Sequence, residues 1–153
     1  MSNTILIIAH APLASALRQC VLHVYSGAGS SDVGSALVAF DVPADQSFDS
    51  TLEAARGVMV QSQAQGTLVL TDVFGATPCN IAQKLVDGVT SRVVAGVNLP
   101  MLLRAVTYRR EPLAVLVARA MAGGTQGVMQ VANVGPQNQA RKRNDQDNDD
   151  HQQ

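Results

Sequence analysis

The sequence is poor in aromatic residues and in cysteine. It has no Trp, two Tyr, three Phe and two Cys among 153 residues. Because proteins bind single-stranded nucleic acids largely by stacking bases on aromatic rings, a platform of that kind is excluded. Cys20 and Cys79 are widely separated and form no CxxC motif, which indicates neither a disulfide framework nor a zinc site. We expect two reduced thiols in or near the core.

Neither sign of charge is in clear excess, and long apolar runs are missing. Eleven Lys and Arg balance twelve Asp and Glu, so the chain lacks the basic field of a protein that binds nucleic acid or an anionic membrane. No apolar run approaches the roughly 18 residues of a membrane-spanning helix. The start, MSNTILIIAH, lacks the basic residues and the long apolar stretch of a signal peptide. We expect a cytoplasmic protein that binds no nucleic acid and does not insert into a membrane.

The usual nucleotide-binding and metal-binding motifs are absent too. The sequence contains no GxxxxGK[ST] loop, no GxGxxG loop and no GxSxG nucleophile elbow. No group of His, Asp and Glu has the spacing of metal ligands. The sequence therefore predicts no cofactor and no metal.

Short apolar runs alternate with segments that repeat apolar residues every three to four positions. The predicted strands cover 4–9, 36–42, 67–71, 91–97 and 127–132. The predicted helices cover 12–25, 47–63, 78–87, 101–107 and 112–124. Ser47 is the expected N-cap of the second helix, and the glycines at 123 and 124 are expected to end the last one.

This alternation predicts an α/β fold, with a doubly wound, mostly parallel sheet and helices on both faces. The expected strand order is 2-1-3-4, so the winding reverses between the first and third strands, and a crevice lies outside their carboxyl ends. The predicted domain spans 1–134. A hydrophilic tail over 135–153 contains too few apolar residues to fold, and we expect it to be disordered.

Two polar side chains follow the strands on either side of this predicted crevice. His10 ends the first strand, and Asp72 follows the third. Neighbouring strands lie about 4.8 Å apart, so these side chains can touch. A carboxylate that accepts the proton of one ring nitrogen leaves the other nitrogen as a nucleophile. The pair is therefore a candidate for covalent chemistry at histidine.

A helix start lies next to this pair, in the segment DVFGATPCN. We expect Thr77 to be the N-cap and Pro78 the first helical residue, so that free backbone amides and the positive end of the helix dipole face the crevice. The helix that begins at Pro12 adds a second N-terminus nearby. The predicted phosphoryl pocket comprises the catalytic residues His10, Asp72 and Thr77, with Ala11, Phe74, Gly75, Ala76 and Pro78 around them.

Each of these features also has an ordinary structural interpretation. His10 alone could be a packed histidine, Asp72 could cap local amides, and Thr77-Pro78 is a common helix start. Only their convergence at one edge of the sheet favours a site that accepts a phosphoryl group. We interpret His23 and His151 as structural or solvated residues. An apolar rim for partner docking is predicted beside the pocket, comprising Pro12, Leu13, Phe74, Asn98, Leu99, Pro100 and Met101.

At these residues the chain resembles the EIIA domain of the mannose-type family of the bacterial phosphoenolpyruvate-dependent sugar phosphotransferase system. The resemblance covers about residues 3–132 and is carried by three ordered blocks, ILIIAHAPLASAL, LVLTDVFGATPCNIA and VVAGVNLPMLLRA. The chain differs from many members of this family, which have a glycine directly after the histidine, because Ala11-Pro12 stand there in this sequence.

The resemblance implies that His10 carries a phosphoryl group on Nε2, received from the phosphocarrier protein HPr and passed to an EIIB partner or used as a regulatory signal. It implies that Asp72 hydrogen-bonds Nδ1 and that Thr77 contacts the phosphoryl group. It also implies a homodimer, in which the last strand is exchanged between subunits and lies antiparallel at the sheet edge. The chain stops after its hydrophilic tail, so a stand-alone EIIA is expected.

Other functions stay open from the residues alone. A receiver-like or small-molecule-binding module could use the same sheet without phosphorylation of histidine, although a receiver needs acidic residues after the first strand. A histidine phosphatase or mutase would place an Arg beside the histidine, and the nearest one, Arg18, lies two helical turns away. The related domain of dihydroxyacetone kinase systems is a further alternative.

Overall fold

The computed structural model describes residues 2–27, 31–62 and 64–133. Its elements, in chain order, are β1 (Thr4–His10), α1 (Leu13–Val24), α2 (Val33–Ala36), β2 (Leu37–Val42), α3 (Phe48–Gln61), β3 (Thr67–Thr71), α4 (Thr77–Leu85), β4 (Ser91–Ala95), α5 (Leu99–Thr107) and α6 (Leu113–Gln126). The predicted strands and helices between residues 4 and 126 are therefore present, with boundaries that shift by at most two residues. The short helix α2 is not anticipated by the sequence pattern. The predicted tail over 135–153 lies outside the described residues.

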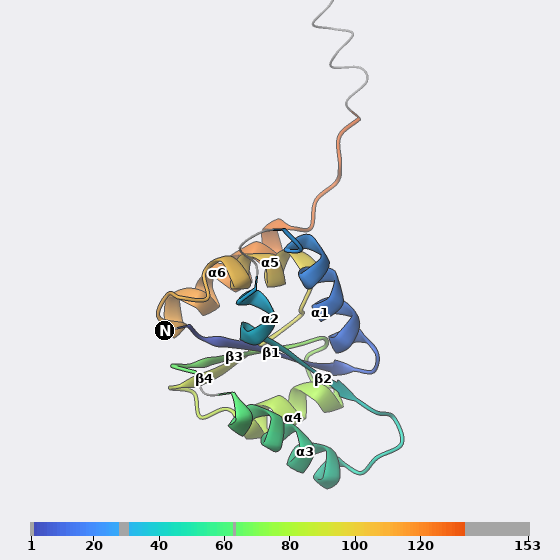
Figure 1. Cartoon of the computed structure of the whole chain (residues 1–153). Coiled ribbons are helices and arrows are strands. Elements are labelled where there is room, and N and C mark those ends of the chain that lie inside the picture. Colours follow the sequence, from blue (N-terminus) through green and yellow to red (C-terminus); the bar gives the residue numbers. More distant parts are fainter. Residues whose placement is uncertain (1, 28–30, 63, 134–153) are drawn as a thin grey trace, which may run out of the picture.

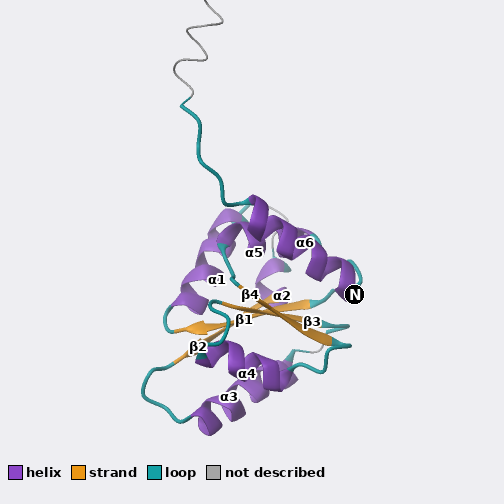
Figure 2. Cartoon of the chain, turned by 180° about the vertical axis from the view of Figure 1, so that it is seen from behind, coloured by secondary structure: helices purple, strands orange, loops and turns teal. Residues whose placement is uncertain are grey.

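The four strands form one parallel sheet in the order β2-β1-β3-β4, which confirms the predicted order. Helices α1, α2, α5 and α6 cover one face of the sheet, and α3 and α4 cover the other (Figures 1 and 2). In a parallel sheet of this kind every strand ends at the same edge, so the residues that follow the strands meet there. We refer to it as the carboxyl edge.

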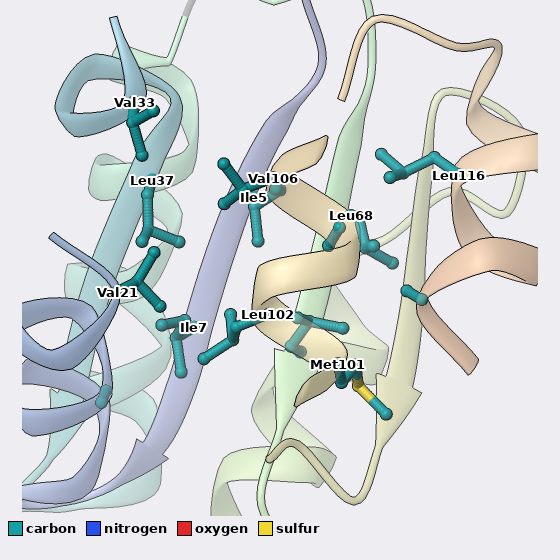
Figure 3. Close-up of a cluster of buried hydrophobic side chains, with 14 of the residues drawn as sticks. Ile5, Ile7, Val21, Val33, Leu37, Leu68, Met101, Leu102, Val106 and Leu116 are labelled. Atoms are coloured by element: carbon teal, nitrogen blue, oxygen red, sulfur yellow. The ribbon is translucent and has the colours of Figure 1, made fainter. Parts of the chain in front are cut away.

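The central strand β1 contributes to two separate cores because successive side chains of a strand point to opposite faces. Ile5, Ile7 and Ala9 pack beneath α1, α5 and α6, where side chains from these helices interdigitate with those of β1 and β3 (Figure 3). Leu6 and Ile8 pack against α3 and α4. Burial on both faces explains why the sequence of β1 is an uninterrupted apolar run.

The predicted strand over 127–132 is not formed in the single chain. After α6 this segment runs away from the sheet (Figure 1), and Val128, Met129 and Val131 are 78%, 70% and 84% exposed. A strand requires a neighbour for its backbone hydrogen bonds, and within the described residues this segment has none. The antiparallel edge strand is therefore absent from this structure.

The predicted end of the last helix at glycines 123 and 124 is wrong, because α6 continues to Gln126. These glycines instead allow α6 to approach α5 closely. A Cβ atom on Gly123 would lie 2.6 Å from Cβ of Arg104, and one on Gly124 would lie 3.2 Å from Cβ of Met101. Such distances are too short for carbon atoms in contact, so glycine is required by helix packing and does not act as a C-cap.

We predict that Gly123→Ala lowers the free energy of unfolding. The added methyl group must push α6 away from α5, at a cost of about 1–3 kcal/mol, and this exceeds the gain of roughly 1 kcal/mol from better helix propensity. Gly57→Ala is the matched control, since Gly57 lies in α3 with open space where its Cβ would be. Urea unfolding should show destabilisation at position 123 and stabilisation at 57, and a stabilised Gly123→Ala would contradict the packing explanation.

Candidate functional site

His10 and Asp72 meet at the carboxyl edge. His10 is the last residue of β1, and Asp72 directly follows β3, the neighbouring strand. The Nδ1 atom of His10 lies 2.6 Å from Oδ2 of Asp72, and the same oxygen accepts the backbone N–H of His10 at 3.0 Å. The other carboxylate oxygen accepts the backbone N–H of Val73 at 3.0 Å. The carboxylate therefore fixes both the ring and the backbone of His10.

This contact determines which ring nitrogen is available. With Nδ1–H donating to Asp72, the other nitrogen, Nε2, keeps its lone pair. The His10 side chain is 54% exposed, whereas that of Asp72 is 9% exposed. The imidazole of His10 is therefore exposed to solvent, while the largely buried carboxylate of Asp72 fixes its orientation through Nδ1.

Asp72 is held in its charged form. Partial burial opposes ionisation and raises the pKa of this carboxyl group, but the hydrogen bonds from the His10 ring and from the His10 and Val73 amides outweigh it, so the pKa lies below its usual range. An ionised carboxylate stabilises the positive charge that the imidazole gains when Nε2 forms a bond.

Helix α4 begins beside this pair, after a turn in which Gly75 has a φ of +84°. Glycine adopts this backbone conformation without steric cost. The prediction that Thr77 is the N-cap is wrong: Ala76 is the N-cap and Thr77 is the first helical residue. As a result the Thr77 side chain, which is exposed, is not used for capping.

The amino end of α4 is the one helix start at the carboxyl edge that no side chain caps, among the four helices that follow the described strands. Ser47 accepts the backbone N–H of Ser50 at the start of α3, and Asn98 accepts that of Met101 at the start of α5. The start of α1 is closed by Asp41, which accepts the backbone N–H of Ser15 at 3.1 Å. The second helix N-terminus predicted at Pro12 is therefore present, and its first turn already binds a carboxylate.

In α4 the backbone N–H groups of Thr77 and Cys79 donate to no acceptor within the described part of the chain. Pro78, the residue between them, has no N–H and is buried, so it offers no donor. Free amides combined with the positive end of the helix dipole favour an anion. The exposed hydroxyl group of Thr77 adds one more donor at the same helix start.

The predicted docking rim is only partly exposed. Phe74 is 77% exposed and Leu13 is 38% exposed, and Ala11, Pro12 and Pro100 also lie on the surface. Met101 does not belong to the rim, because it is 5% exposed and packs in the core (Figure 3).

Two further residues of the predicted rim have structural contacts. Leu99 is half-buried against the same core, and Asn98 caps α5 and donates its side-chain amide to the carbonyl of Gly124 at 3.1 Å. Both therefore contribute less to the exposed surface than the sequence suggests.

Two residues of this region are missed by the sequence patterns. Val73 is 57% exposed next to Phe74 and extends the apolar rim. Asp41, like Asp72, is a single carboxylate near the end of an apolar strand. The sequence patterns nevertheless assign no role to Asp41.

No three His, Cys, Asp or Glu side chains gather closely enough to hold a metal ion within the residues that the structure describes.

Comparison with family models identifies the family of the chain. Residues 4–120 match the model of the mannose-type EIIA family, described as the PTS system fructose IIA component. The chain belongs to this EIIA family. It is thus a component of the sugar phosphotransferase system, a family whose members act in phosphotransfer, and the resemblance seen in the three sequence blocks is confirmed.

Solved EIIA structures share the fold. The mannose/sorbose-specific IIA subunit of Enterococcus faecalis matches with a TM-score of 0.72 and 24% identity over 87% of this chain and 97% of its own. EIIA of Streptococcus agalactiae matches with a TM-score of 0.71 and 23% identity over 84% of this chain and 96% of its own. A PTS IIA protein associated with a fucose utilization operon of Streptococcus pneumoniae gives a TM-score of 0.61 and 19% identity over 90% and 96%.

No curated protein sequence matches the chain significantly. The receiver-like alternative is not favoured by the family and structure matches. Within the described residues of this EIIA protein, none of the helices has the length and apolar character needed to cross a membrane.

We predict that the stabilising effect of Asp72 disappears at acid pH. The folded-state pKa lies below the usual value, so the contribution is present above pH about 4 and is lost as the pH falls through the folded-state pKa. Asp72→Asn should lower the free energy of unfolding by about 1 kcal/mol at pH 7 and by progressively less below pH 4.

Urea unfolding across this pH range measures the difference. The control is Asp45→Asn, because Asp45 is exposed and has no side-chain hydrogen bond within the described residues. A deficit in Asp72→Asn that is constant from neutral to acid pH would contradict the assigned ionisation.

Proposed function

We propose that His10 is the phosphoryl-carrying residue of this EIIA, receiving the group from phospho-HPr and passing it to an EIIB partner. The single observation that carries this proposal is the contact of 2.6 Å between Nδ1 of His10 and Asp72. This contact leaves Nε2 with a lone pair on the exposed side of the ring.

The transfer is a substitution at phosphorus. The Nε2 lone pair of His10 forms a new P–N bond while the P–N bond to the HPr histidine breaks and its electron pair returns to that ring. Asp72 stabilises the positive charge that spreads over the His10 ring. The reverse steps, with EIIB as the acceptor, discharge the protein, and positioning and charge stabilisation supply most of the catalysis.

The uncapped start of α4 supports an assignment for the phosphoryl oxygens. The backbone N–H groups of Thr77 and Cys79 and the hydroxyl group of Thr77 are donors without partners in the described residues. Each charge-assisted hydrogen bond to a phosphoryl dianion contributes on the order of 1.5–3 kcal/mol. Phe74, Gly75 and Ala76 form the turn that precedes these donors, and Ala11 directly follows His10 at the end of β1.

Partner proteins dock on the exposed apolar residues beside His10, in this proposal. This docking rim consists of Pro12, Leu13, Val73, Phe74 and Pro100. Exposed apolar clusters next to a reactive group are typical of protein–protein contact sites. A cytoplasmic location follows from this function, since HPr and EIIB would meet the protein there.

We predict that incubation with phosphoenolpyruvate, Enzyme I and HPr phosphorylates the protein and that His10→Ala abolishes the label. The phosphate should be labile in acid and stable in base, as expected for a P–N bond. His23→Ala is the matched control because His23 is an exposed histidine of α1 away from the strand end. Retention of a wild-type labelling rate in His10→Ala would overturn the proposal.

The same assay separates the supporting roles. Asp72→Ala should lower the rate of transfer by about 10²-fold, within the range of losses for general acid–base and orienting groups. Thr77→Val should lower it less, because the backbone amides remain, whereas Thr77→Ser should retain most of the rate. An unchanged rate in Asp72→Ala would remove its assigned role.

The exposed segment after α6 supports a homodimer. Val128, Met129 and Val131 present apolar side chains to solvent, and among the described residues β4 pairs with β3 alone. We propose that this segment adds to the β4 edge of a second copy, which gives the antiparallel edge strand that the single chain lacks.

We predict that changing Val128, Met129 and Val131 together to Ser converts a dimer into a monomer of 16.1 kDa. Loss of apolar burial weakens the added strand while the four-stranded domain remains intact. Sedimentation velocity measures the change. Val60→Ser with Val89→Ser is the control, since both valines are 75% exposed elsewhere; an unaltered mass in the triple variant would contradict this mode of assembly.

A further inference from the structure

Asp41 connects β2 to the helix that follows His10. In the register of the sheet, Asp41 lies beside Ala9 and Val42 lies beside His10. The Asp41 carboxylate accepts the backbone N–H of Ser15 at 3.1 Å and also the Ser15 hydroxyl group. A residue of one strand therefore caps the helix that begins after the neighbouring strand.

The cap is needed because the local sequence supplies none. Pro12 is the N-cap residue of α1 and has no side-chain acceptor. Ser15 is the third residue of the helix, where a capping side chain normally binds the backbone. The negative charge of Asp41 also complements the positive end of the α1 dipole.

Asp41 and His10 project to opposite faces of the sheet. Ala9 and Ala39 pack in the core beneath α1, whereas Val42, the neighbour of His10, packs in the core beside α3 and α4. Because side chains alternate along a strand, Asp41 shares the face of Ala9, and His10 shares the face of Val42. No hydrogen bond joins the two side chains, so Asp41 acts on His10 through the backbone.

The connection from His10 to α1 is held by β2 at two points. The backbone N–H of Ala11 donates to the carbonyl of Val42 at 3.0 Å, and the Asp41 carboxylate fixes the first turn of α1 at Ser15. Between them lie only Pro12, Leu13 and Ala14. The position of the His10 ring therefore depends on Asp41 as well as on Asp72.

Asp41 also affects where an anion can bind. Of the helix starts on either side of His10, that of α1 already holds a carboxylate, whereas that of α4 keeps free donors at Thr77 and Cys79. A phosphoryl dianion at α1 would have to displace a like charge, so the anion is directed to α4, on the face of the sheet that His10 shares.

We propose that Asp41 is a positioning residue for phosphoryl transfer, which closes the amino end of α1 so that His10 is held in place and the phosphoryl group is directed to α4. This role rests on the proposed function of His10. Asp41 itself does not contact the reacting atoms.

The first test uses inorganic phosphate and backbone amide NMR signals, and it does not require phosphorylation. In the wild type, phosphate should shift the signals of Thr77 and Cys79 and leave that of Ser15 in place. In Asp41→Ala the Ser15 signal should also shift, while Asp41→Asn, whose side-chain oxygen can still accept the amide proton, should resemble the wild type. If phosphate does not shift the Ser15 signal in Asp41→Ala, the role of Asp41 in directing the anion is overturned.

The second test measures transfer from phospho-HPr. Asp41→Ala should lower kcat by about tenfold, because small displacements of a reacting group are costly. KM should stay within about twofold, since Val73, Phe74 and Pro100 of the docking rim lie on other segments. Asp41→Asn should recover most of kcat. Asp45→Ala, which removes a neighbouring exposed carboxylate, is the matched control and should behave as the wild type.

The outcomes are distinguishable. A loss of thermal stability in Asp41→Ala with kcat and KM unchanged would show a purely structural cap and overturn the positioning role. If the wild type itself takes no phosphoryl group from phospho-HPr, the proposed function of His10 fails, while the phosphate titration at Ser15 still decides whether Asp41 closes α1 to anions.

Discussion

The hydrogen bonds that Asp72 accepts from His10 are the constraint on which the site depends. They join the ends of two adjacent parallel strands, β1 and β3, and they orient both the ring and the backbone of the histidine. Such a contact is possible only because the two strands are neighbours although 62 positions separate the residues in the chain. The sheet order is therefore the first requirement of the chemistry, and the apolar cores on both faces of β1 secure it.

The position of His10 and Asp72 could be predicted from the sequence because it follows from topology. Alternating apolar runs and helical segments predict a parallel sheet, and a parallel sheet brings the residues after its strands to one edge. The strand order follows from the same pattern and is confirmed by the structure. The family was indicated by the resemblance of the three sequence blocks, and the family match confirms it. The sequence patterns do not predict details that depend on how a helix is rotated or packed against its neighbours.

Three residues illustrate this difference. The sequence predicts that Met101 belongs to the docking rim, but α5 begins at Leu99, after the Asn98 cap, and Met101 packs in the core. Gly124 resembles a helix terminator in sequence, yet its role comes from the distance to α5. The cap that Asp41 provides depends on the register between β1 and β2 and on a contact across 26 positions, which no local pattern contains.

The closeness of α6 to α5 determines where the chain leaves the domain. A Cβ atom on Gly127 would lie 2.4 Å from the ring of Pro100, so the segment beyond α6 departs next to the docking rim. The other end of the described chain, at Asn3, is bonded to the backbone of Arg109 where β1 starts, at the far edge of the sheet. A fluorophore or affinity tag attached before β1 would thus lie at the edge of the sheet opposite His10 and stand clear of approaching proteins.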